Sequence, residues 1–165
     1  MPPLTGRALS WLALCAMLSG TAGATPILER LSTVASRPSL SADGRIVAFE
    51  DDGVVILDRA TGSRMRICGW APHVSSTGRF VVLSSRCPLV PEDANGFWDV
   101  FVLDRESGSM ELVSVGSDGT QGNGNSGIDD FEWAGATISS DGRFVAFPTR
   151  ASNFDSPDQN EEADL

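Results

Sequence analysis

Two loops of the sequence carry oxygen-bearing side chains at a spacing that could bind a metal ion. Both follow the pattern Asp-x-Asn-x-x-x-Asp, at equivalent places in two related segments of the chain. The candidate ligands are Asp93, Asn95 and Asp99 in the first loop and Asp158, Asn160 and Asp164 in the second. Carboxylate and amide oxygens on a tight loop suit a hard cation, so calcium is the candidate cofactor. The alternative is an Asx-type turn, in which these side chains bond their own backbone and hold the loop.

The sequence offers no recognisable catalytic constellation. The motif Gly-x-Ser-x-Gly does not occur, and His73 is the single histidine, which excludes a His-Glu-x-x-His helix. Nothing marks a nucleophile for a triad built on His73, so we expect a packing residue there and a protein that is not an enzyme. Trp70, Trp98 and Trp133 either pack between structural units or stack on a sugar or a peptide.

The amino-terminal residues have the layout of an export signal. Arg7 precedes an apolar run over residues 8–18, and Ala22 and Ala24 form an A-x-A cleavage site. The run of about 11 residues is too short to cross about 30 Å of hydrocarbon as a helix. We therefore predict a signal peptide over residues 1–24, cleaved after Ala24, no membrane span, and a periplasmic or extracellular location.

Export also bears on the cysteines. Cys15 lies in the predicted signal peptide and is removed with it. Cys68 and Cys87 remain in the mature protein, in a compartment where disulfides persist. An even count is consistent with a Cys68–Cys87 disulfide, and two buried thiols are the alternative.

The charge balance argues against a nucleic-acid partner. The chain holds 12 basic residues against 22 acidic ones, for a net charge of −10. Binding to phosphates requires a basic patch, which this composition does not supply. The same balance suits a soluble exported protein that takes up cations.

Internal repeats organise most of the chain. Residues 41–49 (SADGRIVAF), 75–83 (SSTGRFVVL) and 139–147 (SSDGRFVAF) are copies of one motif. A second motif follows in residues 53–62 (GVVILDRATG) and 99–108 (DVFVLDRESG). The segments are short, rich in Val, Ile and Phe, and bounded by Gly, Asp and Ser, which is typical of strands joined by tight turns. Each unit therefore predicts four antiparallel strands, the arrangement of a propeller blade.

The repeats resemble those of TolB-type β-propellers, and in particular a group of secreted bacterial proteins. The segments that carry this resemblance are residues 89–102 (LVPEDANGFWDVFV) and 117–126 (SDGTQGNGNS), besides the two motifs. The resemblance covers nearly all of residues 38–165, preceded by a linker or the start of a first blade over 25–37. It implies an all-β fold of four-stranded propeller blades, incomplete at about two and a half blades.

The function that follows from the resemblance is binding or scaffolding. We expect a non-catalytic exported module with a protein or glycan partner, which needs further blades or another chain to close the propeller. The alternative is the amino-terminal propeller region of a longer secreted hydrolase of the prolyl-peptidase type.

Overall fold

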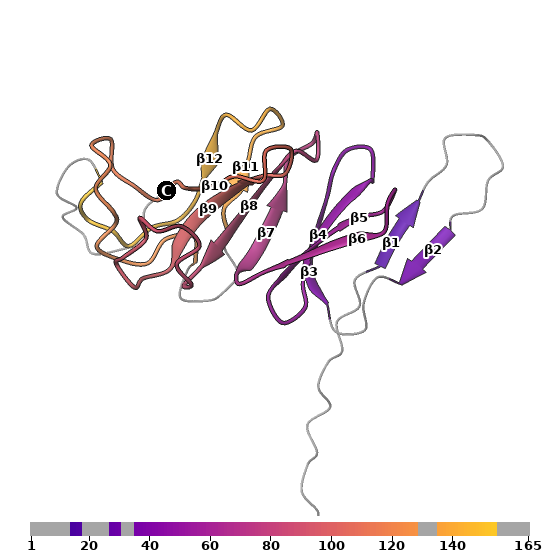
Figure 1. Ribbon diagram of the computed structural model, residues 1–165, viewed down its shortest axis with the longest axis horizontal. Helices are drawn as coiled ribbons and strands as arrows, with labels where there is room; N and C mark the ends of the chain where they lie inside the picture. Colours follow the sequence, from indigo (N-terminus) through magenta and orange to yellow (C-terminus); the bar gives the residue numbers. More distant parts are fainter. Residues whose placement is uncertain (1–13, 18–26, 31–34, 129–134, 155–165) are drawn as a thin grey trace, which may run out of the picture.

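The fold was analysed in a computed structural model that describes residues 14–17, 27–30, 35–128 and 135–154. Every regular element in these residues is a β-strand (Figure 1). Among them there is accordingly no helix with the length and apolar character to cross a membrane. The first two strands, β1 (Leu14–Met17) and β2 (Ile27–Arg30), pair antiparallel with each other. The predicted cleavage after Ala24 lies outside the described residues.

Two four-stranded antiparallel sheets follow, each with its strands in chain order (Figure 1). Blade 1 consists of β3 (Ser36–Leu40), β4 (Ile46–Glu50), β5 (Val54–Asp58) and β6 (Ser63–Ile67). Blade 2 consists of β7 (Trp70–Val74), β8 (Phe80–Ser85), β9 (Asp99–Asp104) and β10 (Met110–Leu112). The pair β11 (Thr137–Ile138) and β12 (Val145–Ala146) begins a third blade. The prediction of an all-β, incomplete propeller with four strands in each blade is confirmed.

The first repeated motif forms the turn between the first two strands of each blade. In blade 1 the Ser41 hydroxyl donates to Asp43 and accepts from the backbone N–H of Ile46, while Asp43 accepts from the N–H of Arg45. Gly44 takes the left-handed conformation that the turn requires, at φ +71°. The same set of bonds recurs in the third blade, from Ser139 to Phe144. The repeat is therefore a turn whose polar side chains satisfy its own backbone.

The arginine of this turn reaches the aspartate that ends the third strand of its blade. Arg45 Nη2 lies 2.8 Å from Asp58 Oδ2 in blade 1, and Arg79 Nη2 lies 2.7 Å from Asp104 Oδ2 in blade 2. The hydrogen bonds from Arg45 hold the pKa of Asp58 at about 2. Those from Arg79 likewise lower the pKa of Asp104 well below its usual range. This ion pair explains why the two motifs recur together.

These aspartates predict a loss of stability in acid. A carboxylate whose pKa is depressed in the folded state contributes stability that is complete above its unfolded pKa of about 4. For Asp58 this contribution is lost as the pH falls toward about 2. Urea midpoints measured between pH 5 and pH 2 should therefore fall less steeply in Asp58→Asn than in the wild type. Glu111→Gln removes an exposed carboxylate outside this turn and serves as the control. Parallel curves for wild type and Asp58→Asn would contradict the prediction.

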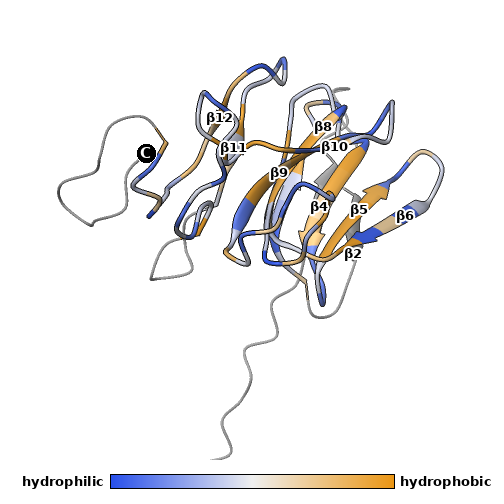
Figure 2. Cartoon of the chain, turned by 60° about the vertical axis from the view of Figure 1, so that its left-hand side comes forward, coloured by the Kyte–Doolittle hydropathy of each residue, from blue (hydrophilic) through white to orange (hydrophobic). Residues whose placement is uncertain are grey.

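The core lies between the blades. Alternate residues of β4 and β5 pack against blade 2, and every residue of these two strands is buried. The cluster between the two complete blades comprises Ile46, Ala48, Val54, Ile56, Val74, Val81, Leu83, Phe101 and Leu103. A second cluster joins the far side of blade 2 to Ala136 and Ile138 of the third blade. Figure 2 shows the central strands as the most hydrophobic part of the chain. Strands covered on both faces read as continuous apolar runs, as these do.

The glycines of the second and third repeated turns each receive a side chain from the preceding blade. Ile46 of blade 1 lies against Gly78 of blade 2, where an added Cβ would come within 2.7 Å of Ile46 Cγ1. Phe80 of blade 2 lies against Gly142 of the third blade in the same way, with even less space for a side chain. Phe144 is the corresponding residue of the third blade, and it is 68% exposed. The apolar residue after each arginine is thus the contact made by one blade on the turn of the next.

Candidate functional site on the loop face

The two ends of the blades differ in how their connections are built. One end, the turn face, carries the repeated turns and a groove of about 630 Å³. The arginines that line this groove are engaged in ion pairs, Arg45 and Arg105 with Asp58 and Arg79 with Asp104. The other end, the loop face, consists of the connections 51–53, 68–69, 86–98 and 113–128. Loops held by a rigid scaffold are the usual carriers of function, so the loop face is the candidate site.

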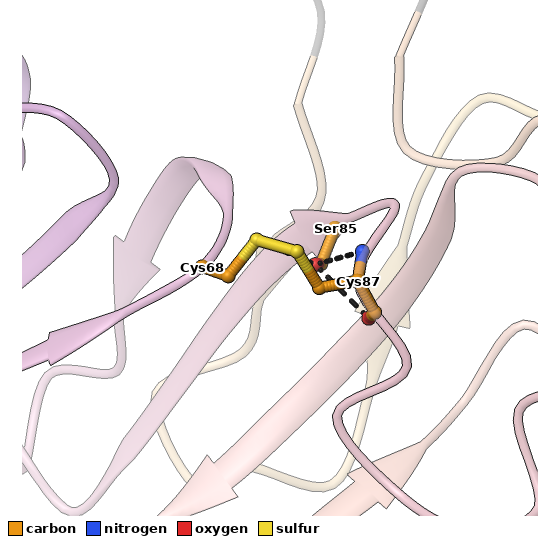
Figure 3. The surroundings of a disulfide bond; sticks show 3 residues. All are labelled: Cys68, Ser85 and Cys87. Atoms are coloured by element: carbon orange, nitrogen blue, oxygen red, sulfur yellow. Dashed lines mark hydrogen bonds between the residues drawn. A yellow bond between two sulfur atoms is a disulfide. The ribbon is translucent and has the colours of Figure 1, made fainter.

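A disulfide joins the two blades on the loop face. Cys68 follows β6 of blade 1 and Cys87 follows β8 of blade 2, and their Cα atoms are 6.2 Å apart (Figure 3). This separation meets the geometric requirement of a disulfide. Ser85 supports the bridge, because its Oγ accepts from the backbone N–H of Cys87 at 2.9 Å. The structure thus contains the bridge between the predicted pair of cysteines.

The predicted metal loop connects β8 to β9, and the structure buries two of its three candidate ligands. Asp93 is 9% exposed and Asp99 is completely buried. Burial, followed by the charge of Asp99, raises the pKa of Asp93. Asn95 behaves as the alternative expected, because its Oδ1 accepts from the backbone N–H of Phe97 in an Asx turn. Its amide group also donates to the carbonyl of Gly122 at 3.2 Å.

A glycine-rich segment, residues 116–127, forms hydrogen bonds to this loop, a role that sequence reasoning missed. Gln121 bonds with its amide group to the backbone of Glu92 and Ala94. Asn125 Oδ1 accepts from the N–H of Trp98 at 3.1 Å, and the N–H of Ser126 donates to the Trp98 carbonyl at 2.7 Å. The polar residues between the glycines were the available signal, because amide side chains can replace a neighbouring strand as hydrogen-bond partners.

The remaining candidate residues have varied surroundings. His73 lies in β7, where burial lowers its pKa and its Nδ1 accepts from the N–H of Ile138 at 3.4 Å, as expected of a packing residue. The guanidinium of Arg37 lies 4.6 Å from the ring centre of Trp70. Trp98 lines a cavity of about 440 Å³ beside the disulfide. Trp133 and the second predicted metal loop, with Asp158, Asn160 and Asp164, lie outside the described residues, so the second loop stays a prediction.

Comparisons with known proteins support the fold. No family model and no curated protein sequence matches the chain. Among solved structures, the tricorn protease aligns over 81% of this chain and 13% of its own, with 15% identity and a TM-score of 0.54. TolB from Acinetobacter baumannii aligns over 77% of this chain and 41% of its own, with 16% identity and a TM-score of 0.42. The β-propeller domain of the Trilobed protease from Pyrococcus furiosus aligns over 79% of this chain and 41% of its own, with 15% identity and a TM-score of 0.47.

At this identity the likeness concerns the fold alone, and the chain spans less than half the length of each of these three proteins. The likeness to the tricorn protease agrees with the strand order, the repeated turns and the packing between sheets described above. The chain is therefore built from β-propeller blades, two of them complete and a third represented by its first two strands.

Proposed function

We propose that the chain is part of an exported, non-catalytic β-propeller that binds or scaffolds a protein or glycan partner through its loop face. The observation that carries this proposal is the construction of the loop 86–98. The Cys68–Cys87 disulfide and the glycine-rich segment hold this loop, and it presents Phe97, 38% exposed, next to Trp98 at a cavity. Aromatic side chains at a rigid surface offer a large contact area at a small entropic cost, which suits recognition of a peptide or a sugar.

Binding assays on the mature protein test this proposal. Glycan and peptide arrays should yield a ligand whose binding is lost in Trp98→Ala and retained in Arg143→Ala, a matched change on the turn face. Retention of binding by Trp98→Ala, together with its loss in Arg143→Ala, would place recognition on the opposite end of the propeller and contradict the proposal.

A second candidate is the propeller region of a longer secreted hydrolase. It is favoured by the likeness to the tricorn protease, in which the aligned region is 13% of the chain. The reading frame beyond codon 165 distinguishes the two candidates, because further blades favour the binding module and a Gly-x-Ser-x-Gly domain favours the hydrolase. Labelling of the full-length secreted protein by a fluorophosphonate probe, abolished by heat denaturation, would support the hydrolase.

We also propose that further blades of the same repeat complete the ring. Ile46 and Phe80 each contact the turn glycine of the following blade, whereas Phe144 presents the same contact to solvent. A large exposed aromatic residue at a repeated packing position marks an interface. The fitting partner is therefore a blade with a Ser-x-Asp-Gly-Arg turn.

Export predicts a defined amino terminus. Mass spectrometry of the secreted protein should find Thr25 as the first residue, because the A-x-A site precedes it. The Cys68–Cys87 disulfide supports the same compartment, since disulfides persist outside the cytosol. Accumulation of the chain with an intact Met1 in the cytosol would contradict this prediction.

A further inference from the structure

Asp99 is a buried carboxylate that the described structure leaves half satisfied. Its Oδ1 accepts from the hydroxyl of Ser114 at 2.6 Å, whereas its Oδ2 has no hydrogen-bond partner in the described residues. The buried Glu50 shows the contrast, because it accepts from Ser36, Arg37 and the backbone N–H of Ala71. A buried charged oxygen without a partner carries a large desolvation cost, so it indicates a missing ligand.

A second buried carboxylate belongs to the loop that leads into Asp99. Asp93, which is 9% exposed, lies six positions before Asp99 in the chain. Within the part of the chain that the structure describes, no arginine forms an ion pair with Asp93 or Asp99, although the buried Asp58 and Glu50 both have one. Two neighbouring carboxylates repel each other in a site of low polarity, and a bound cation removes that repulsion.

We propose that Asp93 and Asp99 bind one calcium ion beneath the loop 86–98, with the unpartnered Oδ2 of Asp99 as a direct ligand. Asn95 Oδ1 accepts one backbone hydrogen bond and retains a second lone pair for the ion. Backbone carbonyls and water supply the remaining ligands of the six to eight that calcium takes. Because the glycine-rich segment is hydrogen-bonded to this loop, ion binding should also stabilise the conformation of the loop face.

The ligand set decides which ion the site favours and how tightly. The described residues contain no group of three or more His, Cys, Asp or Glu side chains that could hold a metal, so this site rests on two carboxylates. Such a low charge places the dissociation constant at about 10⁻⁴ to 10⁻³ M, the range of extracellular calcium modules. Magnesium requires a stricter octahedral geometry and retains its water, so the site should favour calcium.

Blade 1 provides an internal comparison. Gly53 stands in blade 1 where Asp99 stands in blade 2, and the connection 51–53 is too short to carry a counterpart of Asp93. The two complete blades should therefore hold one ion between them, in blade 2.

Calorimetric titration and thermal melting of the mature protein test the proposal. After removal of metals with a chelator, about 10 mM CaCl₂ should raise the melting temperature by about 4–10 °C, and MgCl₂ should raise it less. In Asp99→Asn this shift should shrink and the calcium stoichiometry should fall by one ion. In chelator this variant should be at least as stable as the wild type, because an amide relieves the charge repulsion. Glu111→Gln, which removes an exposed carboxylate of β10, should keep the full response.

Asp93→Asn provides a second test that leaves the Asp99–Ser114 hydrogen bond intact, and it decides the outcome if Asp99→Asn does not fold. It should also lower the stoichiometry by one. The proposal is overturned if the wild type neither binds calcium nor melts at a higher temperature in its presence. It is equally overturned if both variants retain the wild-type stoichiometry, because the ion then binds elsewhere in the chain.

Discussion

Phe101→Ala is expected to lower the free energy of unfolding by about 3–5 kcal/mol. Phe101 lies in β9 and is completely buried in the cluster that joins blades 1 and 2, with residues of β4, β5, β7 and β8 around it. Removal of the ring leaves a cavity between two sheets that are joined by the disulfide and by contacts between their repeated turns, so the sheets can relax little to fill it. Equilibrium unfolding in urea measures the change as a shift of the midpoint at constant slope.

Phe144→Ala is the matched control for this change. Phe144 is largely exposed, so its replacement in this chain should change the stability by about 0.5 kcal/mol or less. In a protein whose next blade covers Phe144, the same substitution should cost several times more, because the side chain is then buried against a turn glycine. Equal costs for Phe101→Ala and Phe144→Ala in this chain would contradict the assignment of the core.

The strands were predictable because one turn recurs. The motif Ser-x-Asp-Gly-Arg predicts a turn whose polar side chains form hydrogen bonds with its own backbone. The apolar runs on either side of the motif predict the strands. The ion pair of Arg45 with Asp58 was not predicted, although both residue types recur together in the two motifs. The turn itself involves residues that are close together in the chain, which is why sequence reasoning recovers it.

The end of the fourth strand was not predictable in the same way. In blade 2 the strand β10 ends at Leu112, although apolar residues continue in the sequence to Val115. The hydroxyl of Ser114 accepts from the backbone N–H of Val100 at 3.0 Å, so a side chain replaces the regular ladder bond there. The same hydroxyl donates to Asp99. A contact between residues this far apart in the chain leaves no periodic mark on the sequence.

The candidate site was predictable in its residues and not in its geometry. The spacing of Asp93, Asn95 and Asp99 suggests three equivalent ligands on one loop. The structure separates their roles, because Asn95 caps the turn at Phe97 while Asp99 opens β9 and is completely buried. The sequence pattern places residues along the chain, but the direction of each side chain depends on the strand that follows and on the segment 113–128 packed beside it.

Reduction of the Cys68–Cys87 disulfide is expected to lower the free energy of unfolding by about 3 kcal/mol. The two cysteines are separated by 19 positions, and opening a loop of this size returns that much conformational freedom to the unfolded chain. The bridge lies at the loop face, where it ties the end of β6 to the loop between β8 and β9, whereas the repeated turns join the two blades at the opposite end. Its loss therefore frees the end of the blade pair that carries the candidate site.

Denaturation of the wild type with and without a thiol reductant, beside the double variant Cys68→Ser, Cys87→Ser, measures this contribution. The reduced wild type and the double variant should unfold at the same lower urea concentration, and the reductant should leave the double variant unchanged. The calcium response proposed for Asp93 and Asp99 should weaken in parallel, because the loop that contains Asp93 and leads into Asp99 begins next to Cys87. Two free thiols in the secreted protein, or identical midpoints for the oxidised and reduced wild type, would contradict the prediction. In that case the packing around Phe101 and the contacts between the repeated turns would be the main interactions that hold the two blades together.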